Sequence, residues 1–272
     1  MFATPRLPAS LVVSLVLTAL PASSIASHSW GNYHWARTGN PFTLSLGDNV
    51  SAEWNWFLAA ASSEWNYSRV LNTTVVPGGT KPRTCKPTAG RVEVCDAAYG
   101  FNGWLGIAQI WISGSHITQG ITKLNNSYFN TAKYNTPAWR NLVICQEIGH
   151  TFGLDHQDEN FSNANLGTCM DYTNNPATNQ YPNAHDFEQL QTIYSHLDGG
   201  TTVLQSNQTG KPSTDPEDEL EVGTAQWGRL IRSTNRGRTE LFELDQGGGH
   251  KKFTFVIWAD PEDQPGAGRG RR

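Results

Sequence analysis

The stretch Cys145–Asp158, CQEIGHTFGLDHQD, decides the fold of this chain. Apolar residues crowd the segment before it, which predicts a deeply buried helix. Side chains four apart share one face of a helix, so Gln146 and His150 are expected to project toward one point. Glu147 then lies beside them on the same helix.

A glycine three residues beyond His150 favours a turn at the end of this helix. Gly153 can adopt a left-handed conformation, so the chain can turn and bring His156 back toward the same point. Three side chains and a neighbouring carboxylate then converge. A catalytic zinc site requires this arrangement: three protein ligands, an open position for water and a general base.

The string QEIGHTFGLDH resembles the extended zinc signature H-E-x-x-H-x-x-G-x-x-H of the metzincin metallopeptidases. Glu147, His150, Gly153 and His156 occupy matching positions. Gln146 departs from the signature, because it stands where the first histidine is expected.

The resemblance extends to a methionine turn. Met170, in GTCMDYT, follows His156 by fourteen residues, where that turn is expected. By the same resemblance Tyr172 lines the cleft or stabilises the oxyanion, although a packing role fits it equally well.

The resemblance implies an α+β, metzincin-like zinc-protease domain with a twisted mixed sheet, an active-site helix and a C-terminal helix. It implies a secreted metalloendopeptidase in which Gln146, His150 and His156 bind zinc (Zn²⁺) and Glu147 is the general base. A peptide substrate would pair with an edge strand within residues 103–113. The alternative is a catalytically silent module of the same fold that binds a peptide or protein.

Gln146 is sterically credible as a ligand, since its amide oxygen reaches as far from the α-carbon as the distal ring nitrogen of histidine. An amide oxygen is a weaker zinc donor than imidazole, so we expect a lower affinity, by about 10–100-fold if the loss resembles that of a damaged second shell. In the alternative, Gln146 only forms hydrogen bonds above an empty pocket. Asp158 is a less suitable substitute ligand because of its spacing.

The amino-terminal residues are typical of a secretory signal. Arg6 precedes the apolar run Leu11–Leu20, and small residues follow in PASSIAS, so we expect residues 1–27 to be removed on export. No stretch reaches the ~20 apolar residues that a membrane-spanning helix needs. The formal charge of −4 argues against nucleic acid as a partner. We expect a monomer that acts on protein or peptide substrates.

Four cysteines in an exported chain favour disulfide bonds. Three pairings exist in principle. Cys85 with Cys95 is the economical choice because it closes a short loop, and it leaves Cys145 with Cys169.

Composition divides the rest of the chain. We expect the metallopeptidase domain at 28–198, a polar and acidic linker at 199–226, a small β unit at 227–260 and a disordered basic tail at 261–272. The β unit reads as a hairpin, RTELFELD and KKFTFVIWA. Near the start of the domain, Ser51 is a candidate N-cap for a helix with a buried face at Trp54, Phe57, Leu58, Ala61 and Trp65.

The remaining histidines give weaker signals. Signal cleavage after Ser27 would expose His28 as an N-terminal copper chelator with His34 as a second ligand, whereas cleavage after Ala26 would abolish that site. Four further histidines have no ligand spacing and are expected to lie at the surface or in the core as satisfied side chains: His116, His185, His196 and His250.

Overall fold

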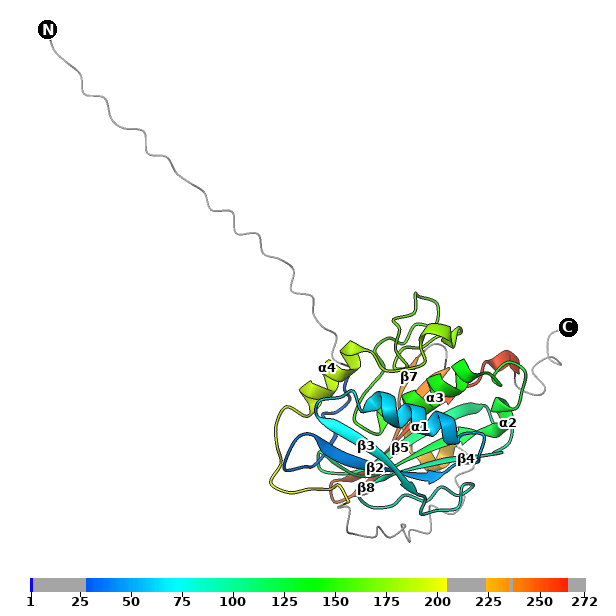
Figure 1. The fold of residues 1–272 in the computed structure, drawn as a ribbon, viewed down its shortest axis with the longest axis horizontal. Helices are drawn as coiled ribbons and strands as arrows, with labels where there is room; N and C mark the ends of the chain where they lie inside the picture. The colour runs from blue at the N-terminus through cyan, green and yellow to red at the C-terminus, as the bar shows by residue number, and fades with distance from the viewer. Residues whose placement is uncertain (2–27, 205–223, 235–236, 264–272) are drawn as a thin grey trace.

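The computed structural model describes residues 1, 28–204, 224–234 and 237–263. Residues 2–27 of the expected signal peptide and most of the expected linker and basic tail lie outside the described residues. The first three residues of the expected disordered tail, Pro261–Asp263, are ordered as a 3-10 helix, which Asp263 ties to Lys133. Within them, the chain forms an α+β fold with a nine-stranded mixed sheet and four α-helices (Figure 1).

The sheet runs in the order β3-β2-β4-β6-β5-β9-β8-β7, and β1 lies beside the start of β6. β1, β2, β3, β4 and β6 make parallel pairs, whereas β5, β7, β8 and β9 make only antiparallel ones. The strands are β1 (His34–Trp35), β2 (Phe42–Asn49), β3 (Leu71–Pro77), β4 (Val92–Ala97), β5 (Trp104–Ser113), β6 (His116–Asn125), β7 (Arg229–Thr234), β8 (Thr239–Gly247) and β9 (His250–Trp258).

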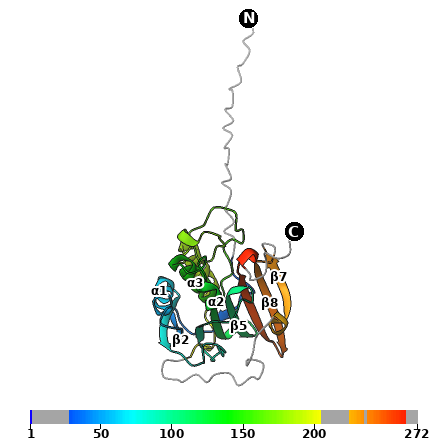
Figure 2. The same cartoon turned by 90° about the vertical axis from the view of Figure 1, so that its right-hand side faces the viewer.

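Helices α1 and α3 cover one side of the sheet, and strands β7 and β8 lie at its far edge (Figure 2). The helices are α1 (Asn55–Trp65), α2 (Asn126–Phe129), α3 (Pro137–His150) and α4 (Ala184–Ile193). α3 packs on β5 and β6, and α1 packs on α3. No helix in the described ranges has the length and apolar character needed to cross a membrane.

α3 begins at Pro137 and ends at His150, just before the expected turn at Gly153. The side chain of Thr136 accepts a hydrogen bond from the backbone N–H of Trp139, and Pro137 occupies the first turn. Gly153 has a φ of +95°, and a Cβ there would lie 2.2 Å from the carbonyl oxygen of Tyr33. Only glycine fits that turn, so the chain leaves α3 in a fixed direction.

The expected N-cap of α1 is wrong. α1 begins at Asn55, and Ser51 instead donates hydrogen bonds to Asp96 from its backbone N–H and its hydroxyl. The Ser51 hydroxyl is directed at the Asp96 carboxylate, and the start of α1 has no side-chain cap hydrogen bond. The expected face is largely confirmed, since Phe57 is half-buried and the other members are buried: Trp54, Leu58, Ala61 and Trp65.

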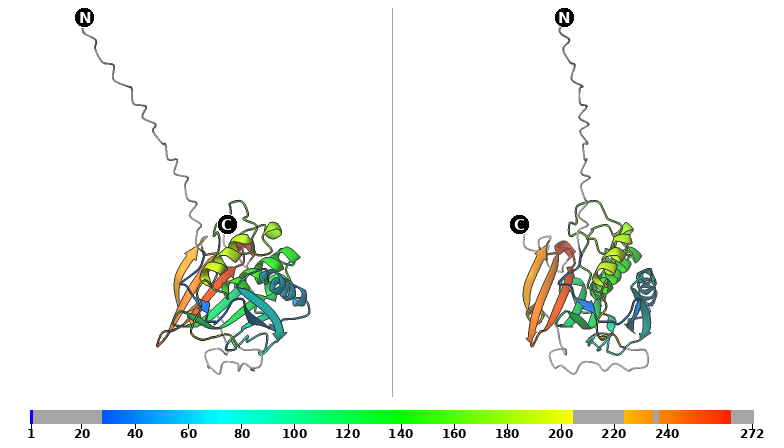
Figure 3. Two further views of the ribbon diagram at one scale, coloured as in Figure 1. Left: turned by 60° about the vertical axis from the view of Figure 1, so that its left-hand side comes forward. Right: turned by 90° about the vertical axis from the view of Figure 1, so that its left-hand side faces the viewer.

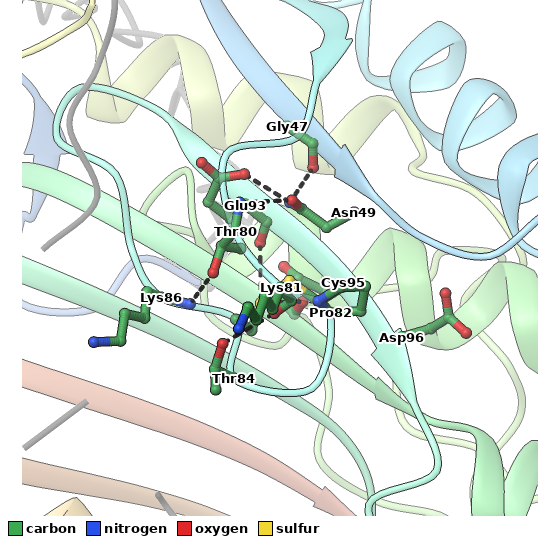
Figure 4. The surroundings of a disulfide bond; sticks show 12 residues. Gly47, Asn49, Thr80, Lys81, Pro82, Thr84, Lys86, Glu93, Cys95 and Asp96 are labelled. Atoms are coloured by element: carbon green, nitrogen blue, oxygen red, sulfur yellow. Dashed lines mark hydrogen bonds between the residues drawn. A yellow bond between two sulfur atoms is a disulfide. The ribbon is translucent and has the colours of Figure 1, made fainter. Parts of the chain in front are cut away.

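Both expected disulfide bonds are present. Cys85–Cys95 fastens the loop before β4 to that strand, and the loop is held further by the bond from the N–H of Lys86 to the hydroxyl of Thr80 (Figure 4). Cys145–Cys169 ties α3 to the segment that carries Met170. Two disulfides favour an oxidising compartment.

The C-terminal strands join the main sheet. β8 and β9 form the expected hairpin, and β9 pairs antiparallel with β5 along nearly its whole length (Figure 3). The expectation that residues 103–113 form an edge strand is therefore wrong, because β5 lies between β6 and β9. The sequence predicts β5 and β9 as strands, but no local signal predicts that they pair with each other.

Side chains of β9 alternate between two apolar clusters. Phe253, Phe255 and Ile257 lie in the main core with the residues of α3. Val256 packs on the opposite face with Trp227 and Phe242. The C-terminal strands thus share the hydrophobic core of the rest of the chain.

We predict that Phe253→Ala lowers the free energy of unfolding by about 3 kcal/mol, since it removes a buried aromatic ring from the main core. Leu230→Ala is the matched control on β7, where the side chain is 44% exposed, and it should change stability by less than about 0.5 kcal/mol. Urea denaturation of both variants measures the difference. If Phe253→Ala lowers the free energy of unfolding no more than Leu230→Ala does, the Phe253 ring adds nothing to the core.

Candidate metal centre

The structure brings His150 and His156 together. His150 lies in the last turn of α3, and His156 follows the Gly153 turn. Their Nε2 atoms are 2.9 Å apart, and both rings are buried.

Each ring directs its second nitrogen elsewhere. Nδ1 of His150 lies 2.9 Å from the carbonyl oxygen of Leu154, to which it must donate. Nδ1 of His156 lies 3.4 Å from Oδ1 of Asp155 and 3.7 Å from Oε1 of Glu159. With the Nδ1 proton of His150 held by Leu154, its Nε2 lone pair faces Nε2 of His156, whose Nδ1 has no hydrogen-bond partner among the described residues. A shared cation would satisfy both facing nitrogens, and zinc-binding histidines usually carry an outer partner such as the Leu154 carbonyl group.

Gln146 supplies an orphan oxygen. Its side chain is fully buried, and its amide N–H donates to the carbonyl oxygen of Cys169 at 2.8 Å. Its Oε1 has no hydrogen-bond partner in the described part of the chain. A buried acceptor left unpaired costs about 1–3 kcal/mol, so this oxygen fits a role as a metal ligand.

Glu147 is buried beside these groups. Burial raises the pKa of its carboxyl group well above the usual range. Its Oε2 has no hydrogen-bond partner among the described residues. The carboxyl group lies over the backbone of β5, where a Cβ on Gly106 would approach its Oε1 to 2.8 Å.

Burial also lowers the pKa of His150 well below its usual value, and the neighbouring His156 adds to this effect. His150 therefore stays neutral at physiological pH. A metal ligand must be neutral imidazole, so the surroundings of His150 suit that role.

Met170 and Tyr172 flank the histidines. A Cβ on Gly149 would lie 2.7 Å from the sulfur of Met170, so the buried methionine packs against α3 one residue before His150. The ring of Tyr172 lies 4.0 Å from that of His156 between centroids. Burial raises the pKa of Tyr172, whose side chain forms a hydrogen bond with Thr239 of β8. Tyr172 therefore faces the C-terminal strands.

The C-terminal strands cover this centre. The ring of Phe255 on β9 is stacked on His150, with 4.1 Å between centroids and 3° between planes. Arg232 on β7 donates two hydrogen bonds of 2.5 Å to the carboxylate of Asp155. Burial alone would raise the pKa of Asp155, but the hydrogen bonds from His156 and Arg232 hold it well below the usual range. The hollow beside His156 leaves no room for a peptide.

Asp158 does not join the centre, since its carboxylate accepts from the backbone N–H of Asn160. The ring of His28 bonds to the carbonyl oxygen of Asp155, whereas Nε2 of His34 lies near Asp198 and His196. These two imidazoles thus have separate partners and share no copper site.

Sequence reasoning missed two groups of residues. It did not identify Phe255 and Arg232 as the cover, because that role depends on the pairing of β5 with β9. His116 and His196 are partly exposed, in agreement with the expectation, but they also meet His34 and Asp198. No spacing in the sequence signals this cluster.

Neither a scan against protein-family models nor a search of curated proteins finds a match to this chain.

We predict that Gly106→Ala destabilises the fold by about 1–3 kcal/mol, because the added methyl group meets Glu147 and a methyl group of Val143 at 2.6 Å. Gly39→Ala is the control, since a Cβ there meets nothing within 4 Å. Chemical denaturation gives both values. A Gly106→Ala variant as stable as its control would contradict the packing of Glu147 against β5.

Proposed function

We propose that this chain is a secreted, zinc-dependent endopeptidase of the metzincin kind. One observation carries the proposal: the Nε2 atoms of His150 and His156 face each other at 2.9 Å, close in the chain to the orphan oxygen of Gln146 and the buried carboxyl group of Glu147. Three neutral donors suit zinc, and a carboxylate next to them suits hydrolysis.

Zinc, when bound, supplies a Lewis acid that polarises the scissile carbonyl group. Glu147 takes the proton of the attacking water and passes it to the leaving amine nitrogen. Its apolar surroundings raise its basicity, because burial disfavours the ionised carboxylate. The bond from Gln146 to the Cys169 carbonyl fixes the amide, so that its oxygen faces away from that carbonyl.

The described conformation is closed to substrate. β9 occupies the side of β5 along which an extended peptide would pair. Phe255, the β9 residue opposite Ala108 in this pairing, lies on the ring of His150. We infer that the C-terminal strands keep the enzyme latent and must move before a peptide binds.

A second candidate function is a silent binding module with a metal centre. The observation that favours it is the burial of Phe253, Phe255 and Ile257 in the main core, which makes the cover costly to displace. In that case β9 is a permanent strand, and the centre serves stability alone.

The activity test uses the full chain, loaded with zinc, and a double variant that loosens the cover, Phe255→Gly with Arg232→Ala. We expect the double variant to cleave a quenched peptide library at least about tenfold faster than the parent chain, because both covering contacts are lost. Chelator should abolish this cleavage, and so should Glu147→Gln in the same background. Zinc content and circular dichroism establish that every variant is folded and loaded.

Two results would decide against the enzyme. The silent module would be supported if the double variant is folded and loaded with zinc but leaves every peptide intact. Cleavage that persists in the Glu147→Gln background would point to a contaminating protease.

Gln146 gives a separate prediction about the metal. Gln146→His should tighten zinc binding by about 10–100-fold, since imidazole is a better zinc donor than an amide oxygen. Gln146→Leu, of similar size and without a donor, should weaken it relative to the parent. Competition with a fluorescent zinc chelator measures all three affinities. Equal affinities would exclude Gln146 as a ligand.

A further inference from the structure

A second set of ligand-type side chains gathers at another place in the fold. His34 in β1, His116 at the start of β6 and Asp198 after α4 have ligand atoms that all lie within 4.8 Å of one another. His196, also after α4, adjoins His34 and Asp198. We call these four residues the amino-terminal cluster. None of them belongs to the centre on α3.

Backbone pairing brings the cluster together. His34 and His116 are direct partners in the parallel register of β1 and β6. The segment after α4 runs beside β1, where the N–H of Asp198 donates to the carbonyl oxygen of Arg37 at 3.0 Å. Residues from three distant parts of the chain therefore meet by virtue of the sheet.

Four distances within the cluster are close to those between the ligands of one tetrahedral ion, with Asp198 and His34 at its centre. Oδ1 of Asp198 lies 3.4 Å from Nε2 of His34, 3.2 Å from Nε2 of His116 and 3.7 Å from Nε2 of His196. The Nε2 atoms of His34 and His196 are 3.1 Å apart. Zinc bonds of 2.0–2.2 Å place tetrahedral ligands about 3.3–3.6 Å from one another, and the observed distances scatter around this range.

The outer contacts hold the ligand atoms in a binding orientation. Nδ1 of His34 lies 2.8 Å from the carbonyl oxygen of Asn32 and must donate to it, which leaves the Nε2 lone pair of the neutral ring facing Asp198. Oδ2 of Asp198 accepts from the side chain and the backbone N–H of Arg37, so Oδ1 stays directed at the histidines. Such second partners are typical of metal-binding histidines and carboxylates.

Protons alone satisfy this cluster poorly. His34 is buried, and its Nε2 lies within 3.4 Å of both Asp198 and His196. A single proton placed between Nε2 of His34 and either Oδ1 of Asp198 or Nε2 of His196 leaves the lone pair of the third atom facing another lone pair. A single divalent cation is attracted to all four atoms at once.

We propose that the amino-terminal cluster binds one zinc ion, with three imidazoles and one carboxylate as its ligands. Four protein ligands leave no open position, so the ion is structural. It joins β1, β6 and the segment after α4. Ions enter from a surface hollow of about 370 Å³, which His34 and His196 help to line.

The test counts zinc in the full chain after dialysis against a limiting zinc buffer. We expect two ions per chain in the parent, one in His116→Ala/His196→Ala, one in His150→Ala/His156→Ala, and none when all four are replaced. His250→Ala is the matched control, since His250 is exposed and outside both sets, and it should keep two.

The replaced side chains of the cluster are 38% and 52% exposed, so their variants are expected to fold. Thermal unfolding adds a second readout. Added zinc should raise the Tm of the His150→Ala/His156→Ala variant, and it should leave the Tm of the fourfold variant unchanged. His196→Gln alone should weaken binding at the cluster at least about tenfold.

Unchanged zinc content and an unchanged Tm response on replacing His116 and His196 would overturn the proposal. Loss of one ion with these two residues, but none with His150 and His156, would uphold the cluster and contradict the metal centre on α3. The two proposals therefore fail separately.

Discussion

Burial of α3 is the constraint on which the rest of this structure depends. Every residue from Trp139 to His150 is buried, and the helix ends inside the protein with Gln146, Glu147 and His150 in its last turns. Polar groups that leave water must find partners or pay for their absence. The carbonyl groups of Leu154 and Cys169 satisfy one donor each. The atoms that remain without such a partner are Oε1 of Gln146 and Oε2 of Glu147, and these oxygens suit a cation.

The same constraint explains the two covalent and steric devices around the helix. The Cys145–Cys169 bond holds the Met170 segment against α3, and this places the Cys169 carbonyl next to Gln146. Gly106 and Gly149 let β5 and Met170 approach the helix more closely than any side chain would allow. A buried helix with a polar end is thus held by small residues, a crosslink and paired backbone groups.

Local signals in the sequence predict much of this fold, and long-range pairing explains the misses. Thr136, Pro137 and Gly153 mark the ends of α3 because capping depends on neighbouring residues alone. The N-cap prediction for Ser51 failed because its partner, Asp96, lies on β4, far away in the sequence. The edge of β5 and the meeting of His34 with His116 depend on strand register, which a single sequence does not specify. Helical spacing predicts that Gln146 and His150 share a face, the turn at Gly153 allows His156 to return, and the resemblance to the metzincin signature singled out these residues.

The energy of the cover decides how the closed state behaves. Exposing Phe253, Phe255 and Ile257 would cost about 1.5–3 kcal/mol each, or roughly 5–9 kcal/mol together. A cost of 5–9 kcal/mol corresponds to an open fraction on the order of 10⁻⁴ to 10⁻⁷, before the hydrogen bonds between β5 and β9 are counted. Thermal opening of the whole strand would therefore be too rare to support appreciable turnover by the proposed enzyme. Loss of the Phe255 and Arg232 contacts, which lie above His150 and Asp155, lowers the cost of moving β9 away from β5, so the double variant should open more often than the parent chain.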